Sequence, residues 1–416
     1  MEWLDDRRIE DEMYMLAALE LARNGAGWVS PNPQVGCVIV QYGEIVGRGW
    51  HTAYGKLHAE REALADCRAR GEDPAGATAY VTLEPCCHYG KTPPCTEALV
   101  EAGVKRVVVG APDPNPLVAG KGCAALREAG ITVDEGVLLE QCLEINRAWF
   151  HYIRTGRPYV IMKYATTADG KIATHTGASQ WLTGRKAVQR AHLDRHRCAA
   201  ILVGANTVRT DDARLTCRWE GAEGEPPATA AGASSPAGPC QPLRIVVDGR
   251  ASVSVESALV QSASAESPVV VLARDDGDSR ERVEALRAAG VEVARLPLRE
   301  KRVSLASLDG GREVSHVFSV IDWETLLDDL GKRGVDSLIV EGGPTIHGSL
   351  ARSGLVNEVH AYLAAKVFGG ANAPGPVGGP LLDDPLDALE LVNPRFEQLG
   401  NDVLVRWEVA PCSRES

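Results

Sequence analysis

His58-Ala59-Glu60 and, further along, Pro85-Cys86-Cys87-His88-Tyr89-Gly90-Lys91-Thr92-Pro93-Pro94-Cys95 are the two stretches that decide the fold of the first half of this chain. They supply a histidine, two well-separated cysteines and a carboxylate. A catalytic zinc site needs three protein ligands, an open fourth position for water and a general acid or base nearby. We therefore predict a site in which His58, Cys86 and Cys95 bind zinc while Glu60 transfers protons.

The spacing of the two cysteines narrows the class of site. A histidine and a glutamate in the order H-x-E, followed by P-C-x-x-C, are typical of zinc-dependent deaminases. Here eight residues separate Cys86 from Cys95 instead of two. The alternatives are a structural zinc with Cys87 or His88 as a fourth ligand, or buried thiols without a metal. The carboxylate of Glu60 favours a catalytic site, because a structural zinc site has no use for it.

Composition limits the classes of protein. The chain has 416 residues, 44% of them hydrophobic, which predicts at least two globular domains. No stretch reaches the roughly 18 consecutive apolar residues of a membrane span, and the acidic start does not resemble a secretory signal. Eleven scattered cysteines indicate reduced thiols and a cytoplasmic location. A net charge of −12 argues against general binding to nucleic acid or to an anionic membrane.

Strands alternate with helices in the first half, which predicts an α/β layered domain over residues 1–150. The helices are expected at 12–24, 58–70, from Pro93-Pro94 onward and at 120–130. The strands are expected in a hairpin around Tyr42-Gly43, at 79–83 and at 104–109. His58 and Cys95 then lie at helix N-termini, where the partial positive charge favours a thiolate ligand.

A second strand and helix series, predicted to form a domain over 157–410, follows a short linker. Its strands are expected at 159–165, 199–203, 244–247, 269–273, 337–340 and 358–363. Residues 221–241 are rich in Gly, Ala, Pro and Ser and are predicted to be a disordered insertion. The Gly342-Gly343 turn connects a strand to a helical stretch at 346–352 and offers backbone amides to a phosphate.

Several motifs, taken in this order, closely resemble those of the bifunctional riboflavin biosynthesis deaminase/reductase family. The lengthened cysteine loop is the most specific of them. The others are Pro31-Asn32-Pro33-Gln34-Val35-Gly36, Asp113-Pro114-Asn115-Pro116, Ala168-Asp169-Gly170-Lys171-Ile172-Ala173, Ser179-Gln180-Trp181-Leu182-Thr183, Asp211-Asp212-Ala213-Arg214-Leu215-Thr216 and Val340-Glu341-Gly342-Gly343-Pro344-Thr345. The resemblance covers nearly the whole chain except residues 221–241.

The resemblance implies a cytidine-deaminase-like N-terminal domain and a dihydrofolate-reductase-like C-terminal domain. It also implies the reactions: hydrolysis of the 2-amino group of 2,5-diamino-6-ribosylamino-4(3H)-pyrimidinone 5′-phosphate, then NADPH-dependent reduction of the ribosyl chain to ribityl. Zinc falls to His58, Cys86 and Cys95, with Glu60 as the proton shuttle. The residues implied to hold this small phosphorylated pyrimidine are Asn32, His51, His88 and Lys91. Analogy with the family also suggests a homo-oligomer.

The family's reductase positions carry over to the second half residue by residue. Those for substrate are Ser179, Arg195, Leu215, Arg218 and Glu341. Those for NADPH are Ala165, Trp181, Thr207, Asp211, Gly343, Pro344, Thr345, Ile346, His347, Gly348 and Ser349. Lys163 is expected to line the same pocket as a substrate contact, and Asp169 either lines it or serves as a turn residue before Gly170.

Two departures from the family pattern concern loop geometry. Thr167-Ala168 stands where the family usually has serine and leucine before the aspartate, and Ala213 replaces a proline. They leave open a deaminase with a catalytically silent, nucleotide-binding C-terminal module. A zinc-dependent nucleic-acid base deaminase is a third hypothesis, which the acidic composition and the lack of a basic, aromatic-interleaved stripe disfavour.

Overall fold

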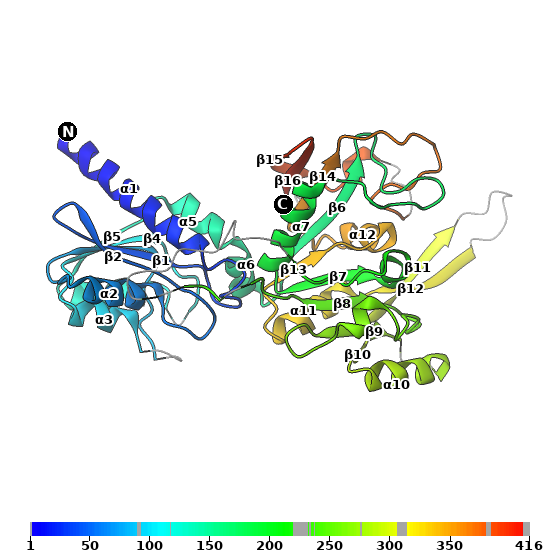
Figure 1. Cartoon of the computed structure of the whole chain (residues 1–416), viewed down its shortest axis with the longest axis horizontal. Helices are drawn as coiled ribbons and strands as arrows, with labels where there is room; N and C mark the ends of the chain where they lie inside the picture. The colour runs from blue at the N-terminus through cyan, green and yellow to red at the C-terminus, as the bar shows by residue number, and fades with distance from the viewer. Residues whose placement is uncertain are drawn as a thin grey trace. The chain divides into compact units, whose positions relative to one another are not determined.

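The computed structural model describes residues 2–89, 93–116, 118–218, 232, 234–236, 238–274, 277–305, 314–379 and 384–410. The chain divides into two compact units. Unit 1 comprises residues 1–156 and 220–240, and unit 2 comprises residues 157–219 and 241–416 (Figure 1). The α/β fold class predicted from the sequence is confirmed in both units.

Unit 1 is built on a five-stranded sheet in the order β2-β1-β3-β4-β5. Its strands are β1 (Gly36–Gln41), β2 (Glu44–Trp50), β3 (Thr78–Leu83), β4 (Arg106–Ala111) and β5 (Thr132–Glu135). Its helices are α1 (Glu2–Arg23), α2 (Ala59–Arg70), α3 (Cys95–Glu101), α4 (Lys121–Glu128), α5 (Leu139–Ile145) and α6 (Arg147–Thr155). β1 pairs antiparallel with β2 and β3, whereas β3, β4 and β5 are parallel.

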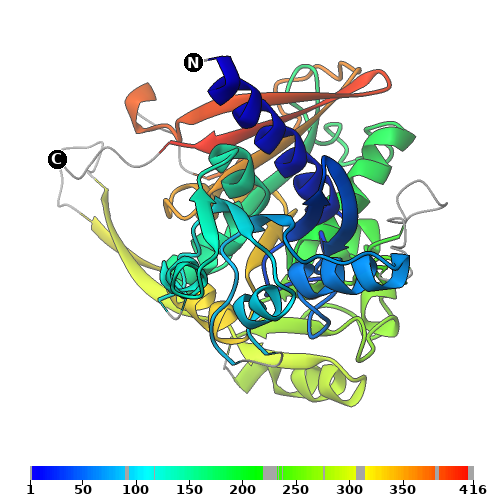
Figure 2. The ribbon, with the colours of Figure 1, turned by 90° about the vertical axis from the view of Figure 1, so that its left-hand side faces the viewer.

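Alternation along the strands creates two hydrophobic cores, one on each face of this sheet. The helices that cover the two faces can be followed in Figure 2. Ile39 and Val81 pack with residues of α2, α3 and α4. Val38 and Tyr80 point the other way and pack with residues of α1, α5 and α6. Unit 1 is therefore a three-layer sandwich, and the ends of its parallel strands are left for a site.

Unit 2 is built on a nine-stranded sheet in the order β10-β9-β8-β7-β13-β6-β14-β16-β15, parallel except for its last two pairings. The strands of this sheet are β6 (Tyr159–Thr167), β7 (Ala200–Gly204), β8 (Leu243–Val247), β9 (Val269–Ala273), β10 (Glu292–Arg295), β13 (Ser337–Val340), β14 (Glu358–Ala364), β15 (Leu391–Leu399) and β16 (Asp402–Val409). A separate two-stranded sheet pairs β11 (Leu298–Leu305) with β12 (Val314–Ile321).

Helices cover both faces of the large sheet. The helical elements of unit 2 are α7 (Arg185–Arg197), α8 (Ala205–Asp211), α9 (Ala258–Gln261), η1 (Gly277–Ser279), α10 (Arg280–Ala288), α11 (Trp323–Lys332), α12 (Pro344–Ala351) and η2 (Pro385–Asp387). Leu202 faces a core shared with α11 and α12, while Val203 faces a core shared with α8, α9 and α10. This doubly covered parallel sheet leaves its carboxyl edge for ligands.

Most elements expected from the sequence are present, and most of their ends are shifted by a few residues. The first helix, expected at 12–24, instead begins at Glu2. The hairpin turns at Tyr42-Gly43, and Cys95 begins α3 as expected. The β15–β16 hairpin was not predicted, because Asn393 and Pro394 interrupt the alternation of β15 and its register shifts there. Residues 369–379 lie in the loop that follows β14.

The predicted insertion at 221–241 lies largely outside the described residues. Where it is described, it belongs to unit 1, although the chain on either side of it belongs to unit 2. The Ser235 hydroxyl donates a hydrogen bond of 2.8 Å to the Asn24 carbonyl oxygen and accepts one of 3.5 Å from the Trp50 indole. At least this part of the insertion is packed against the body of unit 1.

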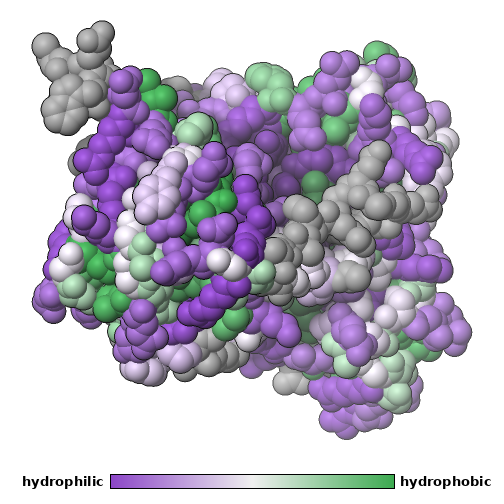
Figure 3. Space-filling model, turned by 60° about the vertical axis from the view of Figure 1, so that its left-hand side comes forward, coloured by the Kyte–Doolittle hydropathy of each residue, from purple (hydrophilic) through white to green (hydrophobic). Residues whose placement is uncertain are grey.

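No helix in the described ranges has the length and apolar composition to cross a membrane. Hydrophilic side chains occupy most of the face seen in Figure 3, and apolar ones are scattered between them.

One close approach between backbones fixes α1 against the sheet. A Cβ atom added at Gly36 would lie 1.9 Å from the Ala18 carbonyl oxygen and 2.7 Å from the Ala22 nitrogen. Both are backbone atoms of α1, so no side-chain rotation relieves the clash. Gly36 at the start of β1 therefore sets how near the helix can lie.

Gly36→Ala is expected to destabilise unit 1 by about 3 kcal/mol or more, because an overpacked core must shift backbone. Chemical unfolding followed by circular dichroism measures the change. Gly277→Ala is the matched control, since a Cβ at Gly277 meets no described atom within 4 Å and its φ is not positive. Equal stability of the two variants would contradict this account of the packing.

Candidate functional site

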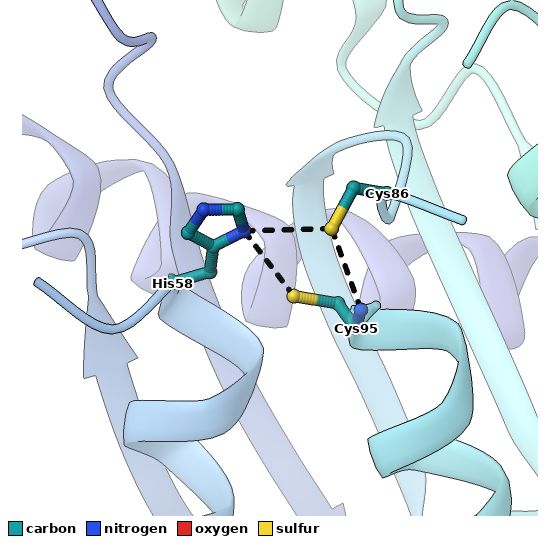
Figure 4. A group of neighbouring side chains, drawn as sticks. All are labelled: His58, Cys86 and Cys95. Atoms are coloured by element: carbon teal, nitrogen blue, oxygen red, sulfur yellow. Dashed lines mark hydrogen bonds between the residues drawn. The ribbon is translucent and has the colours of Figure 1, made fainter. Parts of the chain in front are cut away.

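The predicted metal ligands come together at the ends of three elements. His58 is the N-cap of α2, Cys86 follows β3, and Cys95 is the first residue of α3. The His58 Nδ1 atom lies 3.5 Å from the Cys86 sulfur and 3.4 Å from the Cys95 sulfur. Figure 4 shows the three side chains turned toward one another.

These separations fit zinc. With Zn–S near 2.3 Å and Zn–N near 2.0 Å, a tetrahedral site has N···S edges of about 3.5 Å. The three ligand atoms lie within 4.8 Å of one another, and the described residues offer no fourth metal-ligating side chain to this group. The structural-zinc alternative with Cys87 or His88 as a ligand is thus not supported, and the fourth position is left for water.

The surroundings shift the pKa values of the Cys86 thiol and the Glu60 carboxyl in opposite directions. Hydrogen bonds from Cys95 and His58 outweigh burial and lower the pKa of Cys86 to about 4, so it is a thiolate at neutral pH. Glu60, in the first turn of α2, is only 3% exposed. Burial, reinforced by the Cys86 charge, raises the pKa of Glu60, which suits a group that must both accept and return a proton.

A cavity of about 330 Å³ opens beside the three ligands. His58, Glu60 and Cys86 line it together with three residues expected to contact substrate, Asn32, His51 and His88. The fourth expected contact, Lys91, lies outside the described residues.

The orientation of Asn32 follows from the tautomer of His51. The His51 Nδ1 atom lies 2.9 Å from the Leu57 carbonyl oxygen, which can only accept, so Nδ1 carries the proton. Nε2 must then accept from the Asn32 amide nitrogen, 3.1 Å away. This arrangement leaves the carboxamide oxygen of Asn32 as a hydrogen-bond acceptor in a residue that lines the cavity.

Two carboxylates near the cavity were not assigned a role from the sequence. Asp113 lines it directly, and burial, reinforced by Glu84 and Cys86, raises the pKa of Asp113 to about 6. Glu84 is 3% exposed and accepts backbone N–H bonds from four residues. These are Asp113, Gly120, Gly122 and Cys123. The available signal was the position of each carboxylate just beyond a strand.

A second cavity, of about 560 Å³, lies in unit 2 at the carboxyl ends of its central strands. All of the substrate contacts expected for the reductase line it, together with six of the expected NADPH contacts. These are Lys163, Ser179, Arg195, Leu215, Arg218 and Glu341, with Ala165, Trp181, Thr207, Asp211, Gly343 and His347. Residues far apart in the sequence are thus brought to one pocket.

The other residues of the expected NADPH-binding segment, 343–349, do not line the cavity. Ile346 is buried in the core shared with α11, and the Ser349 hydroxyl accepts a 3.0 Å hydrogen bond from the Trp323 indole. Pro344, Thr345 and Gly348 lie on α12 without lining the cavity. Contacts from this run to a cofactor would therefore come mainly from its first residue, Gly343, and from His347.

A buried ionic cluster organises the second cavity. Arg195 donates two hydrogen bonds of 2.8 Å to the Glu341 carboxylate, and Lys163 Nζ lies 3.4 Å from the same group. Although burial opposes ionisation, the two cations lower the pKa of Glu341 to about 2. Burial, together with Arg195 and Arg214, lowers the pKa of Arg218. That shift is expected where cations gather around a position for an anion.

The segment at Thr167 is ordered by its own side chain. The Thr167 hydroxyl donates a 2.6 Å hydrogen bond to Asp169, which also accepts from the backbone nitrogens of Phe368 and Gly369. Of the two roles considered for Asp169, the structure therefore supports the turn residue rather than a pocket contact. Its carboxylate also anchors the start of the loop at 366–379. The departure at Thr167-Ala168 leaves this turn formed.

Comparisons with known proteins agree with both sites. A family model described as the RibD C-terminal domain matches residues 158–405, and one for the cytidine and deoxycytidylate deaminase zinc-binding region matches residues 8–111. The riboflavin biosynthesis protein RibD of Actinobacillus pleuropneumoniae is 43% identical over 97% of this chain and 96% of its own length.

The chain belongs to the RibD family of riboflavin biosynthesis enzymes. Two solved RibD-family structures cover 97% of this chain and 100% of their own. RibD of Acinetobacter baumannii has a TM-score of 0.78 at 32% identity. A diaminohydroxyphosphoribosylaminopyrimidine deaminase/5-amino-6-(5-phosphoribosylamino)uracil reductase of Thermotoga maritima has a TM-score of 0.76 at 34% identity.

Membership in the RibD family fixes the coarse assignment of the two sites. Unit 1 carries a pyrimidine deaminase with a zinc-binding site at His58, Cys86 and Cys95. Unit 2 carries the RibD reductase domain, which uses NADPH. The predicted fold, enzyme classes and cofactors are thereby confirmed.

The His51–Asn32 contact predicts how substrate affinity depends on pH. Burial outweighs the hydrogen bond to Leu57 and lowers the pKa of His51 from about 6.5 to about 4. The neutral ring therefore contributes its full stability above pH 6.5, and that contribution is lost as pH falls toward 4. We expect the KM for deamination to stay level from pH 8 to 6 and to rise below pH 5, when Asn32 loses its acceptor partner.

Steady-state kinetics with the zinc content measured at each pH separate this effect from loss of metal. His51→Gln, whose amide does not titrate, should remove the rise in KM. If KM rises below pH 5 in His51→Gln as it does in the unaltered protein, another group is responsible.

Proposed function

We propose that unit 1 removes the 2-amino group of 2,5-diamino-6-ribosylamino-4(3H)-pyrimidinone 5′-phosphate and that unit 2 then reduces the ribosyl chain with NADPH. The product would be 5-amino-6-ribitylaminouracil 5′-phosphate. One observation carries the proposal: the chain holds both a zinc-fitting triad with a buried carboxylate and a separate cation-lined cavity. The two activities named for the Thermotoga maritima relative support this order of reactions.

In unit 1, the chain's own residues divide the work of deamination. His58, Cys86 and Cys95 would hold zinc, which would supply an acidified water. Glu60, buried beside these ligands, would accept a proton from water and return it to the departing amine. The carboxamide oxygen of Asn32 accepts a hydrogen bond from a ring N–H or amino group of the pyrimidine.

His88 also fits the role of a substrate contact in unit 1. Its Nδ1 atom is buried and has no hydrogen-bond partner among the described residues, although the residue lines the cavity. A buried polar atom without a partner is costly, and a substrate group would satisfy it. Lys91 remains a prediction from the resemblance.

In unit 2, the cation cluster suits the phosphate end of the substrate. Glu341 holds Arg195 and Lys163 in fixed positions, and Arg218 adds a charge that the cluster does not neutralise. Guanidinium groups bind phosphate through paired N–H donors. Ala165, Trp181, Thr207, Asp211 and Gly343 lie around the same cavity and, with His347, are the positions that we assign to NADPH.

We also propose a cytoplasmic location, which the free cysteines of the described chain support because reducing compartments keep thiols unpaired. Homo-oligomer formation stays a prediction from the resemblance.

Glu60→Gln separates the two activities. The amide keeps the size of the side chain but cannot accept the proton, so we expect deamination to fall by about 10³-fold with zinc content unchanged. Reduction of substrate that is already deaminated should proceed at the original rate. Glu62→Gln, on the same helix and outside the cavity, is the matched control. Loss of zinc from Glu60→Gln would instead make Glu60 a structural residue.

A coupled assay tests the complete reaction. With the diaminopyrimidine phosphate and NADPH, ammonia release should precede NADPH oxidation, and omission of NADPH should leave ammonia release intact. The deaminated intermediate alone should consume NADPH without ammonia. If that intermediate binds but NADPH is never oxidised, unit 2 is a silent nucleotide-binding module and the reductase assignment fails.

A further inference from the structure

Arg244 is a buried cation that neither proposed reaction uses. It lies in β8, is 0% exposed, and donates to neutral acceptors alone among the residues that the structure describes. Its Nη1 atom donates to the Arg214 carbonyl oxygen at 2.9 Å and to the Ser262 hydroxyl at 2.7 Å. Its Nη2 atom donates to the carbonyl oxygens of Ser262, at 2.9 Å, and Ser267.

This arrangement is energetically unusual. Within the described ranges, no carboxylate pairs with Arg244 and its Nε atom has no partner. Burial lowers the pKa of Arg244 to about 10, so it remains charged at neutral pH. Burying an unpaired charge is costly, and an apolar residue would fill the interior of a strand more easily. The role of Arg244 must therefore lie in the carbonyl oxygens to which it donates.

The most informative acceptor belongs to the segment 211–216, here called the pocket loop. This loop carries Asp211 and Leu215, both of which line the reductase cavity. Asp212 and Leu215 have φ values of 43° and 59°, a left-handed conformation that residues with a Cβ rarely adopt. Arg214, whose carbonyl Arg244 holds, lies between them.

The short helix α9 also makes hydrogen bonds that hold the pocket loop in place. The Asp212 carboxylate accepts a 2.8 Å hydrogen bond from the Ala258 nitrogen at the start of α9. Ser262, just after the end of α9, is held by Arg244 through both its hydroxyl and its carbonyl oxygen. Both ends of α9 are thus connected to the pocket loop, one directly and one through the guanidinium.

Local sequence does little to enforce this loop conformation. Ala213 stands where the family usually has a proline, which would restrict the backbone by itself. Hydrogen bonds from outside the loop must then hold two left-handed residues in place. A guanidinium is suited to this because its rigid fork of five N–H donors reaches several carbonyls at once.

We propose that Arg244 is a positioning residue for the reductase: by holding the Arg214 carbonyl against α9, it keeps Asp211 and Leu215 in their places along the cavity. The proposal rests on the reductase activity assigned to unit 2. A purely structural role, in which Arg244 only stabilises β8, predicts general loosening of unit 2. Positioning predicts a local loosening of the pocket loop together with weaker binding in the cavity.

The test uses the full-length zinc-loaded protein and the variant Arg244→Met, which keeps a long side chain but has no donors. Reductase kcat/KM on the deaminated substrate should fall by 10-fold to 100-fold, on the order expected for a displaced binding group, with higher KM for substrate and NADPH. Hydrogen exchange should rise in residues 211–217 but not in β6 or β13. Ammonia release by unit 1 should be unchanged and serves as an internal control.

Arg282→Met is the matched control, because Arg282 also donates to a carbonyl oxygen, that of Arg250, but is exposed and away from the cavity. It should reduce substrate at the original rate. Should Arg244→Met not fold, Arg244→Lys is measured in its place with the same expectations, since an ammonium cannot span all of these acceptors. Arg244→Lys should otherwise recover only part of the loss.

Reduction at the original rate by a folded Arg244 variant would overturn the proposal. So would a loss of activity that accompanies uniform hydrogen exchange across unit 2. Absence of NADPH oxidation by the unaltered protein would instead refute the reductase assignment itself, so the two failures are distinguishable.

Discussion

Parallel strand pairing is the constraint on which both sites depend. Neighbouring parallel strands end at the same edge of a sheet, so the residues that follow them meet there whatever their distance in sequence. In unit 1, Glu84 and Cys86 follow β3, and Asp113 follows the adjacent β4. In unit 2, Glu341 follows β13, which lies between β6 and β7. Each cavity is therefore an edge feature of its sheet, completed by helix starts.

The two units use opposite electrostatic strategies at these edges. Unit 1 places a carboxylate and a thiolate next to each other and relies on a bound cation to balance them, which is the chemistry of a metal site. Unit 2 has its cations built in as Arg195 and Lys163, and uses Glu341 to hold them without cancelling them. We propose that the first arrangement serves to activate water, whereas the second serves to bind an anion and leaves the chemistry to a cofactor.

The sequence predicted features that depend on residue type and local order. His58, Glu60, Cys86 and Cys95 could be placed because helix starts and strand ends are readable from proline, glycine and apolar runs. Hydrogen-bond partners that the tertiary structure brings together from distant segments could not be predicted from the sequence. Glu84 is one such case, because its four amide donors come from the segment after the next strand. Arg244 is another, because its own strand has an ordinary sequence, whereas its acceptors come from two separate segments, at Arg214 and between α9 and β9.

The strand order of unit 2 also bears on how the chain folds. β6 is the first strand of this unit to be synthesised, yet it hydrogen-bonds on both sides to strands from near the end of the chain, with Tyr159 opposite Ser337 and Thr167 opposite Ala364. During translation this strand, rich in apolar residues, has no native neighbour until β13 and β14 emerge. Unit 1, whose strand pairs lie close together in sequence, can form its sheet much earlier. We therefore expect the reductase half to be more exposed to aggregation during synthesis than the deaminase half.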